Sequence, residues 1–312
     1  MTHTQTSGRP TTQAQSFLLA GEESPCWYTA RSGVGSYDPG EAERLLRSSQ
    51  SAAGPDHFRA ARVLLHDGRP HQVALWCIEL RNRARTAAWA TAFGALRSES
   101  LFHLGDLPAA EYEAAEARGD AGRQPAPLSP WTTALLTESL IEQGRHEEAA
   151  ACLGEPADHP DLSGLPPLRA HGRLLLALGR PDDALTAFTR VALLVRRHTT
   201  ELLPHLPWRS DLAQALLRLG RRDQAHALLM EELASPAPGP RERGIALRLL
   251  SATEEPERRL PTLSRAATEL RRSDERMELA RVLNDFAHTL DTLGELSTAE
   301  VFRRRAAGLL AA

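Results

Sequence analysis

One pattern recurs along most of this chain: an apolar helical stripe, then a glycine, then an alanine or valine five residues later. The glycines are Gly68, Gly105, Gly144, Gly179, Gly220 and Gly294. Successive glycines are 37, 39, 35, 41 and 74 residues apart, and the last interval equals two periods of 37. The missing copy falls at Glu254 to Glu257, where Pro256 breaks the helix without a glycine. A fixed period of this length predicts a repeat protein.

Residues at fixed distances from these marker glycines have the same character in every copy. Five residues after the glycine stand Val73, Ala110, Ala149, Ala184, Ala225 and Ala299. Seven before it stand Ala61, Ser98, Thr137, Gly172, Ala213 and Ala287, and four before it stand Leu64, Leu101, Leu140, Leu175, Leu216 and Leu290. Small residues let two helices approach closely, and a leucine fills the space between neighbouring units. The glycine ends the first helix because it adopts positive φ readily.

This pattern predicts helical hairpins that stack on one another. A hairpin of about 37 residues cannot bury its apolar face alone, so its neighbours must cover it. We expect an all-α, right-handed superhelical solenoid of about seven hairpins over residues 39–312. The longest breaks are expected at Arg118 to Ser129, Glu155 to Pro167 and Ser235 to Pro240.

Residues 1–38 have a different composition from the rest of the chain. They are rich in Thr, Gln, Ser and Gly and show no helical period, so we expect them to be mostly disordered. The cluster Cys26-Trp27-Tyr28 is the exception. We expect it to dock on the first repeat, with contact to a partner as the alternative.

Composition and charge exclude several classes of protein. The formal net charge is −3, and all 37 basic residues are arginine, so no overall basic field attracts DNA or an anionic membrane. The three cysteines are far apart, which indicates neither a disulfide framework nor a zinc knuckle and fits a reducing cytoplasm. No signal-peptide pattern and no apolar run of roughly 20 residues is present.

Candidate catalytic and metal-ligating groups all have simpler structural explanations. The paired histidines His66 and His71, and His198 and His205, occur without an HExxH motif, so we expect solvated histidines at helix ends. Asp182-Asp183 follow Pro181, where carboxylates complement the start of a helix. No nucleophile-elbow motif such as GxSxG is present. We therefore predict no enzyme activity, no metal site and no cofactor.

The repeat resembles the tetratricopeptide family, which has a small residue in the first helix, a turn glycine and an alanine five residues later. Its spacing here varies between 35 and 41 rather than holding at 34, which predicts an irregular superhelix. In that family the first helix of each unit lines the concave groove. The resemblance implies groove positions six and ten residues before the marker glycine. The resulting ligand-binding candidates are Arg62, Glu99, Glu138, Arg169, Arg173, Gln214, Asn284 and His288.

These groove positions predict an acidic patch at Glu99 and Glu138 beside a basic patch at Arg169 and Arg173. The alternative is that Glu138 and Arg173 pair across adjacent helices, which contributes about 0–1 kcal/mol when such a pair is exposed. Relatives that clamp a peptide carboxylate use lysine and asparagine, and only Asn284 fits that pattern here.

Two stretches resemble a more specific group. They are PWRSDLAQALLRLGRRDQAHALLMEEL, which begins at Pro207 and is followed by Arg241 to Leu250, and the stretch from Glu275 to Leu310. Both are similar to the helical-repeat region of the large ATP-binding LuxR-type transcriptional regulators of actinobacteria. In that group the repeats lie between a nucleotide-binding module and a DNA-reading module. This sequence has no GxxxxGK[ST] phosphate loop, and we expect it to lack both flanking modules.

The resemblance implies the sensor or protein-interaction part of a regulator, binding a protein partner or a small effector, with no direct nucleic-acid or membrane contact. The alternative is a free-standing scaffold unrelated to transcription. The last helix ends in the apolar run Ala306 to Leu310. Because solenoids usually end in a polar capping helix, we expect this edge to be covered by self-association or by a further domain.

Overall fold

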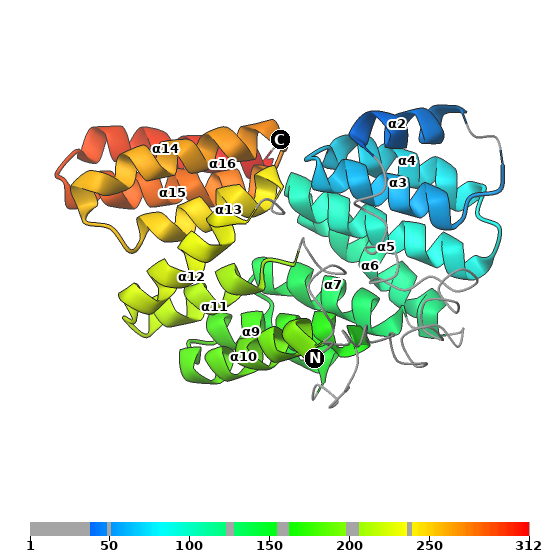
Figure 1. Cartoon of the computed structure of the whole chain (residues 1–312), viewed down its shortest axis with the longest axis horizontal. Coiled ribbons are helices and arrows are strands. Elements are labelled where there is room, and N and C mark those ends of the chain that lie inside the picture. The colour runs from blue at the N-terminus through cyan, green and yellow to red at the C-terminus, as the bar shows by residue number, and fades with distance from the viewer. Residues whose placement is uncertain are drawn as a thin grey trace, which may run out of the picture.

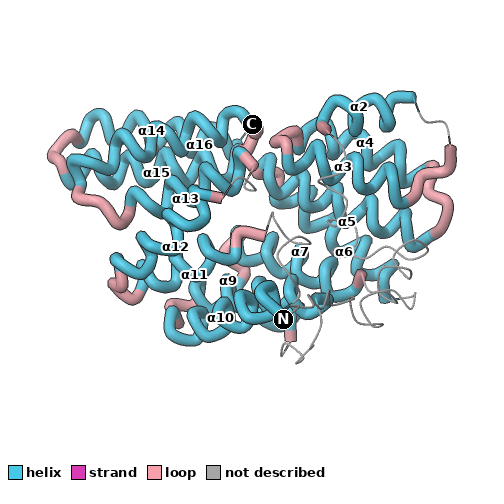
Figure 2. The backbone as a smooth tube through the Cα atoms, viewed as in Figure 1, coloured by secondary structure: helices cyan, strands magenta, loops and turns pink. Residues whose placement is uncertain are grey.

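The computed structural model describes residues 38–48, 51–122, 128–154, 162–197, 206–235 and 239–311. These residues form α-helices and one short 3-10 turn, with no β-strand among them (Figure 2). The helices are α2 (Pro39–Ser48), α3 (Pro55–His66), α4 (Pro70–Asn82), α5 (Ala87–Leu104), α6 (Leu107–Gly122), α7 (Ser129–Glu142), α8 (His146–Leu153), α9 (Leu165–Ala177), α10 (Pro181–Arg197), α11 (Trp208–Arg218), α12 (Arg222–Ala234), α13 (Pro240–Ser251), α14 (Pro256–Arg272), α15 (Arg276–Thr292) and α16 (Leu296–Ala311). The Cys26-Trp27-Tyr28 cluster, His198 and His205 lie outside the described residues.

The described helices pair into seven hairpins, from α3–α4 to α15–α16, which confirms the predicted solenoid. The six marker glycines have φ between 72° and 85°, so each ends its helix as the pattern predicts. The α13–α14 hairpin turns at Ala252 to Glu255 without a glycine, as the degenerate copy requires. Two predicted breaks are misplaced at one end. The first begins too early, because α6 continues through Arg118 to Gly122, and the second ends too late, because α9 begins at Leu165.

The periodic leucines and small residues form the core. The leucine four residues before each glycine is at most 9% exposed, and the alanine or valine five residues after it is fully buried. Gly172 shows why the position seven residues before the marker glycine must be small, since a Cβ there would lie 2.4 Å from the Phe188 ring. The repeat signature therefore records how closely paired helices approach.

An aromatic cluster fixes the first three units against one another. Phe58 of α3 packs edge-on against Trp131 of α7 with ring centroids 6.0 Å apart. Trp89 and Phe93 of α5 lie 5.8 and 5.7 Å from Phe58. Such contacts add to the burial of large apolar area, so α3, α5 and α7 form a rigid wall on the inner side of the solenoid.

The superhelix bends back until its last two units contact its first units (Figure 1). We call this contact the seam. His66 Nδ1 of α3 lies 3.7 Å from Glu242 Oε2 of α13, and His103 Nδ1 of α5 lies 2.8 Å from Glu275 Oε1 beside α15. Glu142 of α7 forms a further ion pair, with Arg281 of α15. The described helices therefore close into a ring around the concave surface.

The apolar end of α16 takes part in this closure. Leu309 packs partly buried against a cluster that includes Ala280 and Leu283. A side chain of Leu310 lies against Gly105 in the turn between α5 and α6, where an added Cβ would meet it at 3.0 Å. The chain's own first units thus cover part of the edge for which we expected a second copy or a further domain. Among the described helices, none is both long and apolar enough to cross a membrane.

Candidate ligand-binding cavity

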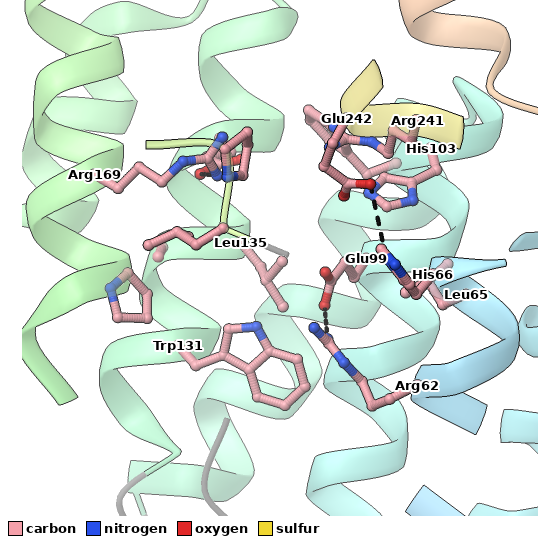
Figure 3. A pocket seen from close by; sticks show the side chains of 16 residues that line it. Arg62, Leu65, His66, Glu99, His103, Trp131, Leu135, Arg169, Arg241 and Glu242 are labelled. Carbon is pink, nitrogen blue, oxygen red and sulfur yellow. Dashed lines mark hydrogen bonds and ion pairs between the residues drawn. The ribbon is translucent and has the colours of Figure 1, made fainter. Parts of the chain in front are cut away.

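The concave surface holds a cavity of about 100 Å³, and Figure 3 shows the side chains that line it. Its walls come from α3, α5, α7, α9 and α13 and from the segment just before α11. The lining residues are Arg62, Leu65, His66, Glu99, Phe102, His103, Trp131, Ala134, Leu135, Glu138, Pro166, Arg169, Leu206, Pro207, Arg241 and Glu242. Inner helices from distant parts of the sequence therefore contribute to one site.

The charged side chains in the cavity are paired across neighbouring helices. Arg62 Nη1 donates to Glu99 Oε2 at 2.5 Å, joining α3 to α5. Arg173 Nη1 donates to Glu138 Oε2 at 2.7 Å, joining α9 to α7, which is the alternative pairing that the sequence allowed. The expected acidic and basic patches are therefore not separate surfaces, since their charges neutralise each other pair by pair.

Arg169 lies at the junction of three helices. Its Nε donates to Asp211 Oδ2 of α11 at 2.5 Å, and its Nη1 donates to Glu138 Oε1 at 3.3 Å. Burial on its own would raise the pKa of Glu138, but Arg173 and Arg169 hold that pKa below its ordinary value. Glu138 is thus ionised, and the network presents fixed charges of known sign to the cavity.

One side of the cavity wall is apolar. Trp131 of α7 is 5% exposed and lies one turn from Leu135 of the same helix, and Phe102 of α5 also lines the cavity. A mixture of aromatic surface and a few fixed polar groups is typical of ligand sites. The arrangement can hold a ligand that carries both an apolar and a polar part.

A second buried carboxylate lies next to the network. Ser210 Oγ of α11 donates to Glu232 Oε2 of α12 at 2.7 Å. Burial raises the pKa of Glu232 to about 7, and the nearby carboxylates Asp211 and Glu242 act in the same direction. Glu232 therefore changes its charge near neutral pH, beside a residue that lines the cavity.

The predicted groove residues divide into two groups. Arg62, Glu99, Glu138 and Arg169 line the cavity, and Arg173 joins them through Glu138. Gln214 is half-buried on α11 and does not line the cavity, while Asn284 and His288 are exposed on α15.

Asn284 and His288 do not line the cavity because of how α15 contacts the first units. The contact is made by its N-terminal end, at Glu275 and Met277, so residues two or more turns further along α15 lie away from the cavity.

Sequence reasoning missed His66, His103, Arg241 and Glu242. The expectation of a solvated helix-end histidine is wrong for His66, whose side chain is 20% exposed and faces Glu242 across the seam. A signal was present, because His66, His103 and the seam residue Glu142 each stand two residues before a marker glycine. That position ends the first helix of a unit, where it faces the far end of a closed ring.

Other candidates behave as simple structural features. Asp182 and Asp183 lie in the first turn of α10, and Asp183 pairs with Arg180 at 2.7 Å, as the helix-start interpretation predicts. In the part of the chain that the structure describes, no three histidine, cysteine or acidic side chains are grouped to hold a metal ion.

Comparison with known proteins gives the class of the fold. The family model described as tetratricopeptide repeat matches residues 130–155, 165–188 and 207–229, which correspond to the α7–α8, α9–α10 and α11–α12 hairpins. These segments are tetratricopeptide-type repeats. No curated protein matches the sequence.

Among solved structures, the chain is similar to a Rap protein in a crystal structure titled as complexed with competence and sporulation factor. The TM-score is 0.63 at 12% sequence identity, and the match covers 95% of this chain and 84% of that chain. At this identity the likeness establishes the fold: a tetratricopeptide-type solenoid that shares its overall architecture with the Rap protein.

Proposed function

We propose that this chain is a non-catalytic binding module whose ligand, a protein segment or a small effector, occupies the central cavity. The observation that carries the proposal is the convergence of five inner helices on one cavity with both charged and aromatic walls. Tetratricopeptide-type repeats and a fold neighbour that was solved with a bound factor support a role in interaction.

The charged network suits recognition because it is already ordered. Arg62, Arg169 and Arg173 are each held by a carboxylate, so a ligand does not have to fix long flexible side chains when it binds. A polar group of the ligand would instead take the place of one of the carboxylates that now pair with these arginines. Polar groups of the ligand then determine specificity, and Trp131 with Phe102 supplies apolar contact area.

The finer proposal is that the module is the sensor or interaction part of a LuxR-type transcriptional regulator. It rests on the sequence resemblance of the stretches that form α11–α12 and α15–α16. A reducing cytoplasm is the proposed setting, in keeping with the free cysteines Cys77 and Cys152. Self-association through the exposed part of α16, where Leu296 and Val301 are uncovered, is a further element of the proposal.

A peptide-display screen tests the binding role. Peptides enriched on the full chain are measured by fluorescence anisotropy against Trp131→Ala and Arg169→Ala, with Arg180→Ala on the outer surface as the control. We expect affinity to fall at least about tenfold for the two cavity variants, which is the size of a typical interface hot-spot effect, and to stay unchanged in the control. Equal affinity for all variants would place the ligand elsewhere.

A second experiment separates the regulator from the free-standing scaffold. Chromatin is co-precipitated with the tagged chain in its host and sequenced, and the same is done with Arg169→Ala. A regulator component is expected to enrich particular promoters through its partners, and the cavity variant is expected to change that pattern. A chain that enriches no promoter while still capturing a cavity-dependent protein partner would favour the scaffold.

A further inference from the structure

Four of the residues that line the cavity also belong to the seam. They are His66 and His103 from the first two units and Arg241 and Glu242 from α13. Figure 3 shows Glu242 reaching His66 at the edge of the cavity, with His103 and Arg241 close by. The seam is therefore one wall of the cavity, and any separation of the two ends widens the cavity and its access to solvent.

The cavity is partly open to solvent, and it is small for the kind of ligand that this class of site holds. Its volume of about 100 Å³ is well below the roughly 300–1,000 Å³ of pockets that enclose drug-sized ligands. It accommodates a few waters or a small polar group. A protein segment or a sizeable effector therefore requires a more open arrangement of these walls.

The seam is polar, and several of its buried charged atoms are imperfectly satisfied. Glu275 is 1% exposed and, among the described residues, forms ion pairs with His103 and Arg241 at 2.8 and 3.1 Å. Both of its carboxylate oxygens, with His103 Nδ1 and Arg241 Nε, lack a well-aligned hydrogen bond among the described residues. Opening the seam would hydrate these buried charged groups, which reduces the free energy that favours closure.

The two ends nevertheless fit each other closely. A Cβ added to Gly68, in the α3–α4 turn, would lie 2.4 Å from both Cα and Cβ of Ser273 in the α14–α15 turn. At Gly179 and Gly144, which have the same positive φ, an added Cβ would meet nothing within 4 Å. The close approach at Gly68 is a feature of the seam and not of the repeat.

We propose that the seam is a gate over the cavity: α13 and α15 separate from α3 and α5 to admit a ligand and close in its absence. This inference rests on the proposed function for the identity of the site, but access to the cavity can be measured without any ligand. A polar, tightly fitted interface within one chain is the kind that opens and closes in solution.

Cysteine labelling measures access directly. Ala134 lines the cavity and is 3% exposed, so Ala134→Cys places a thiol inside with little change in volume. The full-length variant is labelled with a charged methanethiosulfonate reagent, and peptide-level mass spectrometry separates position 134 from Cys26, Cys77 and Cys152. When opening is fast relative to labelling, the rate at position 134 follows the population of the open form.

Two seam variants and one control are combined with Ala134→Cys. Gly68→Ala forces the α14–α15 turn away, and Glu142→Arg sets an arginine against Arg281. Gly179→Ala introduces the same left-handed strain without touching the seam. Glu142→Gln removes the ion pair with Arg281 without setting a like charge against it, and it leaves the pairing of Arg281 with Glu278 in place.

We expect labelling at position 134 to be about tenfold faster with Gly68→Ala or Glu142→Arg, less accelerated with Glu142→Gln, and unchanged with Gly179→Ala. Equal rates in all backgrounds would overturn the gate, as would acceleration by Gly179→Ala that matches Gly68→Ala. If Gly68→Ala fails to fold, the Glu142→Arg series decides the question alone. Because no ligand is used, a failure of the binding role leaves this result intact.

Discussion

The middle units and the end units of this solenoid follow the same repeat to different degrees. The tetratricopeptide model matches the three middle hairpins, and it matches neither the first two hairpins nor the last two. Among the described residues, the middle units contact mainly their neighbours, and Glu142 of α7 reaches further through its ion pair with Arg281. The end units contact each other across the seam.

The difference shows that the repeat pattern is less regular in units whose helices pack on their neighbours and also contact a distant unit. The α13–α14 hairpin has lost the marker glycine, and α13 contributes Arg241 and Glu242 to the seam. In the α9–α10 hairpin, by contrast, Gly179 faces open space and only has to end a helix. Contacts between distant units are specific to one protein, so they have no counterpart in a family pattern.

The largest expected effect comes from a middle-unit core position. Leu216→Ala removes a side chain that is 5% exposed, and we expect it to lower the free energy of unfolding by roughly 2–5 kcal/mol. The matched change at the seam is Leu310→Ala, a residue that is 46% exposed, for which we expect less than about 1 kcal/mol. Chemical denaturation of both variants measures their free energies of unfolding. Equal losses of stability would contradict the difference between the middle-unit core and the seam.

The next effect is a pH dependence that arises where the middle units meet the cavity. The native pKa of Glu232 is about 7 against an ordinary value of 4.5, so the native state favours the protonated form. Its stabilising contribution is complete below pH 4.5 and disappears as the pH rises through 7. We expect Glu232→Gln to be a few kcal/mol more stable than the natural chain at pH 8, and no more stable near pH 4.

Thermal denaturation of both proteins between pH 4 and pH 8 checks this expectation. The difference between the two curves isolates Glu232 from the histidines that titrate in the same range. A difference that does not grow with pH would show that the buried carboxylate is stabilised by neighbours other than those described.

A smaller effect separates two turn glycines. Gly68→Ala and Gly179→Ala both place a side chain at positive φ, which costs about 1–2 kcal/mol. We expect Gly68→Ala to cost more, but only by as much as seam closure contributes, because the ends can separate instead of clashing. Hydrogen exchange at residues 273–277 should accelerate in Gly68→Ala alone, and identical exchange in both variants would contradict the difference.

The smallest effect is expected at an outer surface pair. Arg180 and Asp183 are both more than half exposed, so Asp183→Ala should change stability by no more than about 0.5 kcal/mol. Glu142→Arg at the seam provides the comparison, since its partner Arg281 is largely shielded from solvent. A large loss of unfolding free energy for Asp183→Ala in a denaturant titration would show that exposed ion pairs contribute more to hairpin stability than expected here.

The sequence predicted those parts of the fold that repeat. Leu216, Ala225 and Gly220 recur because each unit must pack on the next in the same way, so a single chain reveals their roles through periodicity. The cavity was predicted in part, since Arg62, Glu99 and Glu138 occupy equivalent positions on successive inner helices.

The seam was not predicted, because ring closure depends on the rotation accumulated over all seven units. The sequence near His66 or Glu242 does not reveal this accumulated rotation, so it does not predict that the two residues meet. The same closure places Asn284 and His288 outside the cavity, although the periodicity assigns them to the groove. The row formed by His66, His103 and Glu142 becomes informative only when the opposite end of the ring is known.

The central claim is that the described helices form a closed ring whose seam can open. Small-angle X-ray scattering of the full chain, compared with Gly68→Ala and Gly179→Ala under the same conditions, tests this claim most directly. We predict a compact profile for the natural chain and for Gly179→Ala, and a larger radius of gyration for Gly68→Ala. An extended profile for the natural chain, or no difference among the three proteins, would contradict the account.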